Sequence, residues 1–483
     1  MHRALKSAKV LVGKGKSASE ARDPMQTECS AGRMAFGEVS GRNVVADFGG
    51  GTITSDAGAL LLGAADRAIG LTERFARCFT DARAAHLVEH DVRSLVLQRV
   101  AGIALGYEDL VDHDHLRHDP VLAALAGRLD AGRAGCAPLA GKSTLNRLEL
   151  GRGEPTRYHR IGHDPAAIEA LFVDVFLDAH RVPPGQIVLD LDATDDPIHG
   201  HQEGRFFHGY YDCYCYLPLY IFCGRHLLAS RLRPSNVDGA AGAVEDVARI
   251  VGHIRRRWPR VRILLRADGG FCRETLMAWC EAHRVDFLFG LARNPRLVEE
   301  ITRELAAAEA ESARTGRPAR RYRDFRWLTR DSWSRARRVV GKAEWTGGAA
   351  NPRFVVTSLS PAEIKARPLY EAIYCARGEM ENRIKECQLD LFADRTSSGT
   401  MRANQLRLWF ASMAYVLLCA LRRIGLAHTQ FATATCGTIR LKLLKIGAQV
   451  IRSVRRIRVA MASAHPWQYE FGLAHALLTK AAR

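Results

Sequence analysis

The sequence predicts an α/β protein, because apolar segments of strand length alternate with helical patterns between residues 164 and 294. The strand segments are 187–191, 206–223, 226–233, 261–268 and 286–291, and helices are expected at 165–180, 243–258 and 273–283. Three strand segments come first, and each of the last two follows a helix. This order is that of an RNase H-like sheet.

Two acids, Asp190 and Asp192, lie within the first strand segment. Strand periodicity places both on one face. An ionised carboxylate removed from water costs several kcal/mol unless it is paired or bound to metal. Two explanations are open at this point: solvated acids leading into a turn at Asp196-Pro197, or ligands of a metal ion.

The N-terminal third favours helices. Amphipathic runs cover 93–103 and 121–129, and Ser55 or Asp56 is expected to cap a helix that follows. Ser143 or Thr144 is expected to cap another helix, where Lys142 and Arg147 are predicted to contact DNA phosphates.

Three motifs in this third suggest ligands but are better explained as structure. Gly49-Gly50-Gly51-Thr52 lacks the hairpin pattern that flanks nucleotide loops, and the Gly135–Lys142 segment has five residues between its glycines where a phosphate loop has four. We therefore expect no nucleotide partner. The cluster from Asp112 to Pro120 contains several metal-ligand types, but such clusters are usually solvated turns.

Composition indicates a partner and a compartment. Lys plus Arg number 70 against 52 acids, a net charge of +18, which favours DNA as a polyanionic partner. The region from 436 to the C-terminus is especially basic, and Arg455 and Arg456 are predicted to contact phosphates. The 12 cysteines include no C-x-x-C pair, which favours a reducing cytoplasm, with the protein on the nucleoid. The longest apolar stretch, 408–421, is shorter than the roughly 20 residues that span a bilayer, so we expect a buried helix and no membrane partner.

The chain beyond 294 contains an interruption and then a long helix. A charged helix at 296–314 precedes strand-like pieces at 322–328, 337–345 and 354–359. The predicted domains are a disordered basic tail (1–35), a mostly helical DNA-binding region (36–163), the first core part (164–294), an insertion with β-strands (295–365), a second core part with the catalytic helix (366–435) and a basic C-terminal region (436–483).

The helix expected at 370–391 carries Arg377, Glu381 and Lys385, spaced by four and so on one face. An exposed ladder of ion pairs is one explanation. The other is a phosphoryl-transfer site in which Glu381 joins Asp192 and Asp268, since carboxylates are the hard oxygen ligands that two Mg²⁺ ions require.

The motifs Asp192-Ala193-Thr194 and Tyr374-x2-Arg377-x3-Glu381, with Asp268 at a strand end, resemble those of DDE transposases of bacterial insertion sequences. The chain is most similar, from about residue 45 onward, to the group numbered thirteen-eighty in the cut-and-paste branch. This resemblance implies Asp192, Asp268 and Glu381 as catalytic metal ligands. It implies that Tyr374 and Arg377 hold the transposon end. The lysine that ends the family motif falls at Gln388, so its role is absent or passes to Lys385.

The resemblance also implies cofactors, partners and a reaction. Two Mg²⁺ ions per site, with Mn²⁺ as a substitute, would support hydrolysis at the element end and attack of the freed 3′-OH on target DNA. Double-stranded DNA is the expected partner, bound at terminal inverted repeats by a homodimer. Asp192 is preferred over Asp190 as the ligand, while Asp190 and Thr194 are expected beside the ligands. Two alternatives are a metal-dependent RNase H-like nuclease that does not join strands and a non-catalytic DNA-binding protein derived from a transposase.

Overall fold

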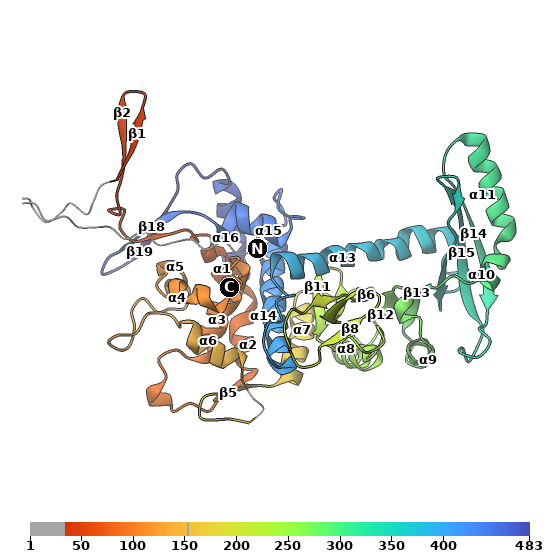
Figure 1. Ribbon diagram of the computed structural model, residues 1–483, viewed down its shortest axis with the longest axis horizontal. Coiled ribbons are helices and arrows are strands. Elements are labelled where there is room, and N and C mark those ends of the chain that lie inside the picture. Colours follow the sequence, from red (N-terminus) through yellow and green to blue (C-terminus); the bar gives the residue numbers. More distant parts are fainter. Residues whose placement is uncertain (1–33, 152–153) are drawn as a thin grey trace, which may run out of the picture. The chain divides into compact units, whose positions relative to one another are not determined.

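The computed structural model describes residues 34–151 and 154–483, and it confirms a mixed α/β protein with a large mixed sheet (Figure 1). The chain divides into one unit up to Gly51 and a second from Thr52. The described part of the first unit is an antiparallel hairpin of β1 (Met34–Val39) and β2 (Arg42–Ala46). The predicted disordered tail lies outside the described residues, except for its last two residues, which begin β1.

Five strands of the large sheet position the site. They are β6 (Gln186–Ala193), β10 (Leu219–Cys223), β11 (His226–Arg231), β12 (Arg262–Ala267) and β13 (Asp286–Leu291). They lie in the order β11-β10-β6-β12-β13. β12 is parallel to β6 and β13, whereas β10 is antiparallel to β6 and β11. Residues 206–216, expected to be part of one strand with β10, instead form β8 (Phe206–His208) and β9 (Cys213–Tyr216) of a small sheet with β7 (Asp196–Pro197).

The strands of the segment predicted as an insertion (295–365) extend the large sheet instead of forming one of their own. β17 (Arg353–Thr357) pairs antiparallel with β13, and β15 (Arg337–Thr346) and β14 (Ala319–Trp327) follow outward, with β16 (Ala349–Ala350) beside β15. The charged helix is divided at buried Ile301 into α10 (Pro295–Glu300) and α11 (Thr302–Thr315).

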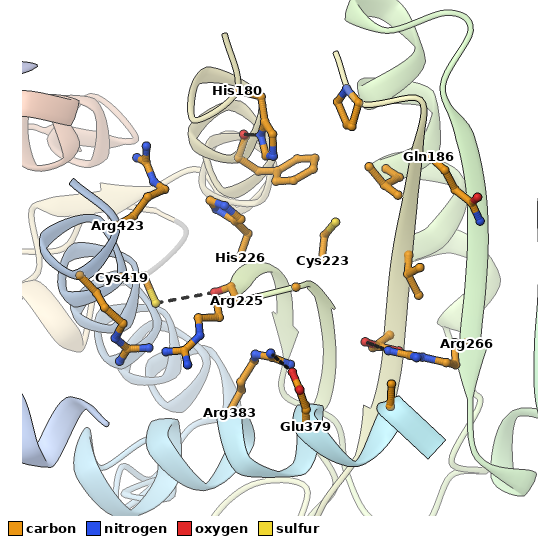
Figure 2. Close-up of a pocket in the computed structure, with 18 of the residues that line it drawn as sticks. His180, Gln186, Cys223, Arg225, His226, Arg266, Glu379, Arg383, Cys419 and Arg423 are labelled. Atoms are coloured by element: carbon orange, nitrogen blue, oxygen red, sulfur yellow. Dashed lines mark hydrogen bonds and ion pairs between the residues drawn. The ribbon is translucent and has the colours of Figure 1, made fainter. Parts of the chain in front are cut away.

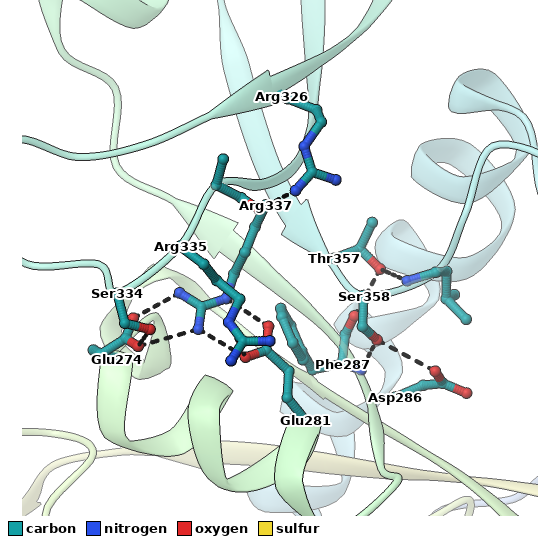
Figure 3. Close-up of polar contacts among 12 residues, drawn as sticks. Glu274, Glu281, Asp286, Phe287, Arg326, Ser334, Arg335, Arg337, Thr357 and Ser358 are labelled. Atoms are coloured by element: carbon teal, nitrogen blue, oxygen red, sulfur yellow. Dashed lines mark hydrogen bonds and ion pairs between the residues drawn. The ribbon is translucent and has the colours of Figure 1, made fainter.

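An arginine joins the insertion to the helix after β12. The Arg337 guanidinium, on a side chain only 2% exposed, binds Glu274 and Glu281 of α9 (Glu274–Ala282) at 2.6 and 2.7 Å. Figure 3 shows these contacts together with Ser334, whose hydroxyl donates to Glu274. Hydrogen bonding to Arg337 keeps the pKa of Glu274 below its usual value. The insertion is therefore fixed to the core by both strand pairing and a buried ion-pair network.

Helices cover both faces of the sheet. α7 (Pro165–Asp178), α8 (Ala243–Arg257) and α9 share one apolar core with β6, β12 and β13. On the other face, α14 (Met401–Ala420) packs through Tyr415 against Phe222 of β10. The α14 segment is long and apolar enough to cross a membrane, but 83% of its apolar window is buried inside the protein. It is the buried helix that the sequence predicts.

The N-terminal helices and the C-terminal chain share the α14 core. The helices are α1 (Ala59–Ile69), α2 (Leu71–Ala76), α3 (Val92–Ala104), α4 (His113–Leu116), α5 (Pro120–Leu125), α6 (Lys142–Glu149), α15 (Cys436–Ile439) and α16 (Gln468–Ala481). β18 (Ala448–Arg452) pairs with β19 (Ile457–Met461) and β3 (Ile53–Thr54), and β4 (Phe79–Asp81) pairs with β5 (Ile161–His163). The basic C-terminal region is thus part of the fold.

Both predicted helix caps are wrong. α6 begins at Lys142, before Ser143, because the Asp114 carboxylate of a different segment accepts the Lys142 N–H at 3.0 Å. α1 begins after Gly58, because Asp56 is buried and accepts a hydrogen bond from the Tyr107 hydroxyl at 2.6 Å instead of capping.

Candidate active site

Asp192 and Asp268 lie at the same edge of the sheet. Asp192 is the penultimate residue of β6, and Asp268 directly follows the neighbouring parallel strand β12. The Asp268 carboxylate accepts the Gly270 N–H at 2.9 Å and caps a short 3-10 turn, Gly269–Phe271. Because the carboxyl ends of parallel strands meet at one edge, two residues 76 positions apart in the chain become neighbours.

The third acid lies on an interrupted helix. The sequence predicts one helix over 370–391. The structure has five successive helical segments in this region: α12 (Ala366–Pro368), a π-helical segment (Leu369–Tyr374), a 3-10 turn (Cys375–Arg377), α13 (Gly378–Lys385) and a second π-helical segment (Glu386–Asp390). π-helical turns are rare and frequently found at functional sites.

Arg377 connects the strand acid to the helix acid. Its guanidinium donates to Asp192 Oδ2 at 2.9 Å and to Glu381 Oε1 at 2.7 Å. Asp192 is 14% exposed, whereas the Glu381 side chain is 49% exposed. Arg377 and Glu381 share one helix face, as the spacing of four predicts, but their ion pair reaches into the sheet edge and is more than a surface ladder.

Burial raises the pKa of Asp192 to about 6, the Arg377 guanidinium opposes that rise, and the negative charge of Asp268 adds to it. Two mutually repelling carboxylates therefore meet at the sheet edge, with a single guanidinium compensating them.

Asp190 has a partner that the sequence analysis missed. Arg266, directly opposite on β12, donates to both Asp190 carboxylate oxygens at 2.5 and 2.8 Å. Arg266 also donates to the Ile373 carbonyl, next to Tyr374. An arginine inside the apolar run 261–267 was the signal available, since a buried strand has no place for an unpaired charge.

A glycine makes room for Tyr374. A Cβ at Gly290 of β13 would lie 2.6 Å from the Tyr374 hydroxyl and 2.8 Å from the Gly269 nitrogen. The bare backbone at this position lets both the Asp268 turn and the tyrosine approach the strand. Burial raises the pKa of the Tyr374 hydroxyl, while Arg377 opposes and Asp268 adds to the rise.

The remaining motif positions lie around this centre. Gln388, at the place of the family lysine, donates from its side-chain amide to the Asp195 carbonyl at 2.9 Å. Lys385 is exposed at the end of α13. The Thr194 N–H donates to the Pro218 carbonyl, which holds the chain just after Asp192.

Aromatic residues of the β8–β9 hairpin lie beside the acids. Burial raises the pKa of Tyr211 to about 12, and the charges of Asp195, Asp192 and Asp268 contribute. Tyr210 of the same hairpin is 85% exposed. The sequence predicts this aromatic run only as part of a strand, because no local pattern shows that it lies next to Asp192.

Four predicted DNA contacts lie outside this centre. Lys142 forms an ion pair with Asp114 at 3.4 Å, and Arg147 lines a cavity with Tyr158. Arg455 and Arg456 lie in the turn between β18 and β19 and are exposed. Within residues 34–151 and 154–483, no ion pair joins any of these four to the three acids.

The donor set suits a divalent cation at the aspartate pair. Asp192 and Asp268 provide hard oxygen ligands, and a cation between them would relieve their repulsion. Among the described residues, however, no three acidic, histidine or cysteine side chains surround one point. Glu381 is held by Arg377, so its carboxylate is free to bind a cation only when that ion pair opens.

Comparisons with known proteins place the chain in a family. No curated protein matches it. A cryo-EM structure of the piggyBac transposase synaptic complex with hairpin DNA aligns over 81% of this chain and 79% of that chain, with 11% sequence identity and a TM-score of 0.39, a likeness that carries no argument about the site. Residues 36–483, which contain all three acids, match the family described as Transposase DDE domain group 1. The chain belongs to this family of DDE transposases.

Proposed function

We propose that this transposase binds the terminal inverted repeats of an insertion sequence and cuts and joins DNA strands there by a cut-and-paste route. The observation that carries the proposal is that the Arg377 guanidinium binds both Asp192 and Glu381, while the charge of Asp268 acts on Asp192. The motifs favour a bacterial element of the group numbered thirteen-eighty.

The sheet supports an RNase H-like core. β10 and β11 lie antiparallel on one side of β6, and β12 and β13 lie parallel on the other. In such a core the acids at the β6 and β12 ends face a helix that comes much later in the chain. The strands of 319–357 then form the insertion, and residues 36–163 form the helical DNA-binding region.

Arg377 links DNA binding to the release of the carboxylates. A guanidinium binds a phosphate as well as a carboxylate, with two parallel hydrogen bonds. When a DNA phosphate enters, Arg377 would move its hydrogen bonds from Asp192 and Glu381 to the phosphate, with Tyr374 beside it. Both carboxylates are then released at the moment the substrate arrives.

The released carboxylates would hold the metal ions. Two Mg²⁺ ions at Asp192, Asp268 and Glu381, or Mn²⁺ in their place, would supply the Lewis acidity that phosphodiester hydrolysis and strand transfer need. Asp190 supports this set through Arg266, and Thr194 through its backbone. Neither is proposed as a ligand.

Basic residues away from the centre would position the duplex. Lys142, Arg147, Lys385, Arg455 and Arg456 are exposed and carry no sequence information of their own, as expected of phosphate contacts. Bringing two transposon ends together requires two protomers, so the working form is a homodimer on DNA. We place it on the nucleoid in the cytoplasm.

The test begins with the inverted repeats that flank the coding region, used as labelled duplexes with the full chain. With Mg²⁺ the wild-type protein should nick at the repeat end, and pre-cut ends should join to a target duplex. Asp192→Ala, Asp268→Ala and Glu381→Ala should each abolish cutting while duplex binding persists. Asp331→Ala removes an exposed acid of the insertion and serves as the matched control.

Each result decides between the candidate functions. Cutting without joining identifies a nuclease on the same fold. Binding without cutting in the wild-type protein identifies a DNA-binding protein that no longer catalyses. Wild-type cutting by any of the three acid variants refutes the assignment of that acid.

A further inference from the structure

A cavity of about 730 Å³ lies beside α13, the helix that carries Glu381, and takes no part in the proposed reaction. Its walls come from the first half of β6, the turn between β10 and β11, α7, α13 and the π-helical turn Leu421–Gly425 after α14. Small-molecule sites are typically about 300–1,000 Å³, so the size is that of a ligand pocket.

The lining of this cavity has an excess of positive charge. Five arginines and two acids line it: Arg225, Arg266, Arg383, Arg422 and Arg423 against Asp190 and Glu379. One pair cancels, because Arg266 binds both oxygens of Asp190. Four arginines then remain, and Glu379 binds only one of them, Arg383, at 2.8 Å.

Three of these arginines have buried donors without a protein acceptor. In the described part of the chain, Arg225 Nη1, Arg383 Nε, and both Nε and Nη1 of Arg422 make no hydrogen bond. Arg422 is only 3% exposed and uses its remaining nitrogen on Glu386 at 2.8 Å. Leaving a buried charged donor unpaired costs at least 1–3 kcal/mol, so four such nitrogens in one place call for an acceptor.

The three arginines come from different elements and line the same cavity. Figure 2 shows Arg225, from the β10–β11 turn, and Arg383, from α13, with their guanidinium groups near one another at one end of the cavity. His180 and His226 lie toward the other end, with ring centroids 5.5 Å apart. Phe176 packs edge-on against both histidines. The cavity thus has one end with Arg225 and Arg383 and another end with aromatic rings, near which Arg423 also lies.

His226 does not add to the charge. Burial, with the nearby Arg423 and His180, lowers the pKa of His226 to about 3, so its ring is neutral at ordinary pH. Phe176 and His226 therefore offer uncharged ring faces to a ligand.

We propose that this cavity binds a phosphate monoester of a small organic molecule, with the phosphate on Arg225, Arg383 and Arg422 and a planar group against Phe176, His180 and His226. A phosphate monoester carries three terminal oxygens and up to two negative charges, which suits four unpaired donor nitrogens on three guanidinium groups better than a carboxylate does. Arg383 lies two residues after Glu381, so the bound phosphate contacts the helix that carries the third acid.

The test is calorimetric titration of the metal-free full chain with inorganic phosphate, phenyl phosphate and phenol. Saturable binding of both phosphates is expected, with phenyl phosphate roughly tenfold tighter because its ring is buried, and no binding of phenol. Arg225→Gln and Arg383→Gln should each weaken phenyl phosphate roughly tenfold or more. Arg256→Gln, an exposed arginine of α8 outside the cavity, should leave it unchanged.

Two results would overturn the proposal. One is the absence of saturable phosphate binding by the wild-type protein at millimolar concentrations. The other is unchanged affinity in both cavity variants while their circular dichroism and urea midpoints match the wild type. Using variants on two separate elements guards against a folding defect in either.

A third arm identifies the source of the phosphate. If phosphate groups of DNA are the natural ligand, a random-sequence duplex should displace phenyl phosphate, and both cavity variants should lose duplex affinity, which refutes the small-molecule assignment. If the duplex and phenyl phosphate bind together, the small-molecule assignment stands. Neither outcome depends on DNA cutting.

Discussion

Arg266 and Asp190 lie opposite each other on parallel strands, and one guanidinium binds both carboxylate oxygens at 2.5 and 2.8 Å. Both residues are buried, with 8% and 2% exposed. Because Arg266 also donates to the Ile373 carbonyl, this ion pair ties the sheet to the segment that carries Tyr374. A carboxylate so occupied is expected to support the site and not to bind metal.

Asp190→Ala should therefore destabilise the fold. Removing one partner leaves the Arg266 charge buried and unpaired, so urea unfolding should show a loss of about 3–5 kcal/mol in the free energy of unfolding. The double variant Asp190→Leu with Arg266→Met should recover much of that loss, because no buried charge remains. Unchanged stability with loss of Mn²⁺ binding would instead make Asp190 a metal ligand.

Arg377→Gln should tighten binding of a divalent cation in the absence of DNA. The guanidinium competes with a cation for Asp192 and Glu381, so its removal should raise Mn²⁺ affinity roughly tenfold in calorimetric titration. Cutting should fall in the same variant, because the proposed contact with the DNA end is lost. Arg367→Gln breaks an ion pair with Glu371 earlier in the same helical segment and serves as the control. Weaker Mn²⁺ binding would mean that Arg377 positions Asp192 for metal instead.

The strands and acids could be predicted because their signals are local. The apolar runs of β6, β12 and β13 and the acids near their ends are visible in windows of about ten residues. Their meeting at one edge follows from parallel pairing. The bridge from Arg377 to Asp192 could not be predicted, because it joins residues 185 positions apart through a helix whose π-helical and 3-10 turns leave no periodic signal.

Other features depend on tertiary contacts that no local pattern contains. The insertion strands join the core sheet because β17 pairs with β13, more than sixty residues earlier. The hairpin β1–β2 went unpredicted because nearly all of its residues are exposed, so no apolar alternation marks it. His113 was interpreted as part of a solvated turn, yet its side chain is fully buried, because Gln98 of α3 supplies a hydrogen bond across the core.

Gly290→Ala should disable the site while the protein still folds. The new methyl group would collide with the Tyr374 hydroxyl and the Gly269 backbone, which costs about 1–3 kcal/mol of stability and displaces the Asp268 turn. Displacing the Asp268 carboxylate in this way should lower the cutting rate on the order of a hundredfold. Gly252→Ala, in α8 with open space around it, should leave cutting unchanged and slightly raise stability. Normal cutting by Gly290→Ala would show that Tyr374 and Asp268 need not approach β13.

His113 should make the fold sensitive to acid. Burial, with the nearby Arg99 charge, lowers its pKa from 6.5 to about 3. The folded state therefore holds the ring neutral where the unfolded chain would protonate it, so the free energy of unfolding falls as pH drops below 6.5 and stops falling near the folded pKa. Between pH 6.5 and 5 this histidine alone should lower the free energy of unfolding by about 2 kcal/mol.

His113→Gln cannot titrate at this position, so its free energy of unfolding should fall by about 2 kcal/mol less than that of the wild type over the same range, whatever its stability at neutral pH. His428→Gln, an exposed histidine, should follow the wild-type curve. Parallel curves for the wild type and His113→Gln in urea unfolding would mean that His113 is protonated in the folded protein.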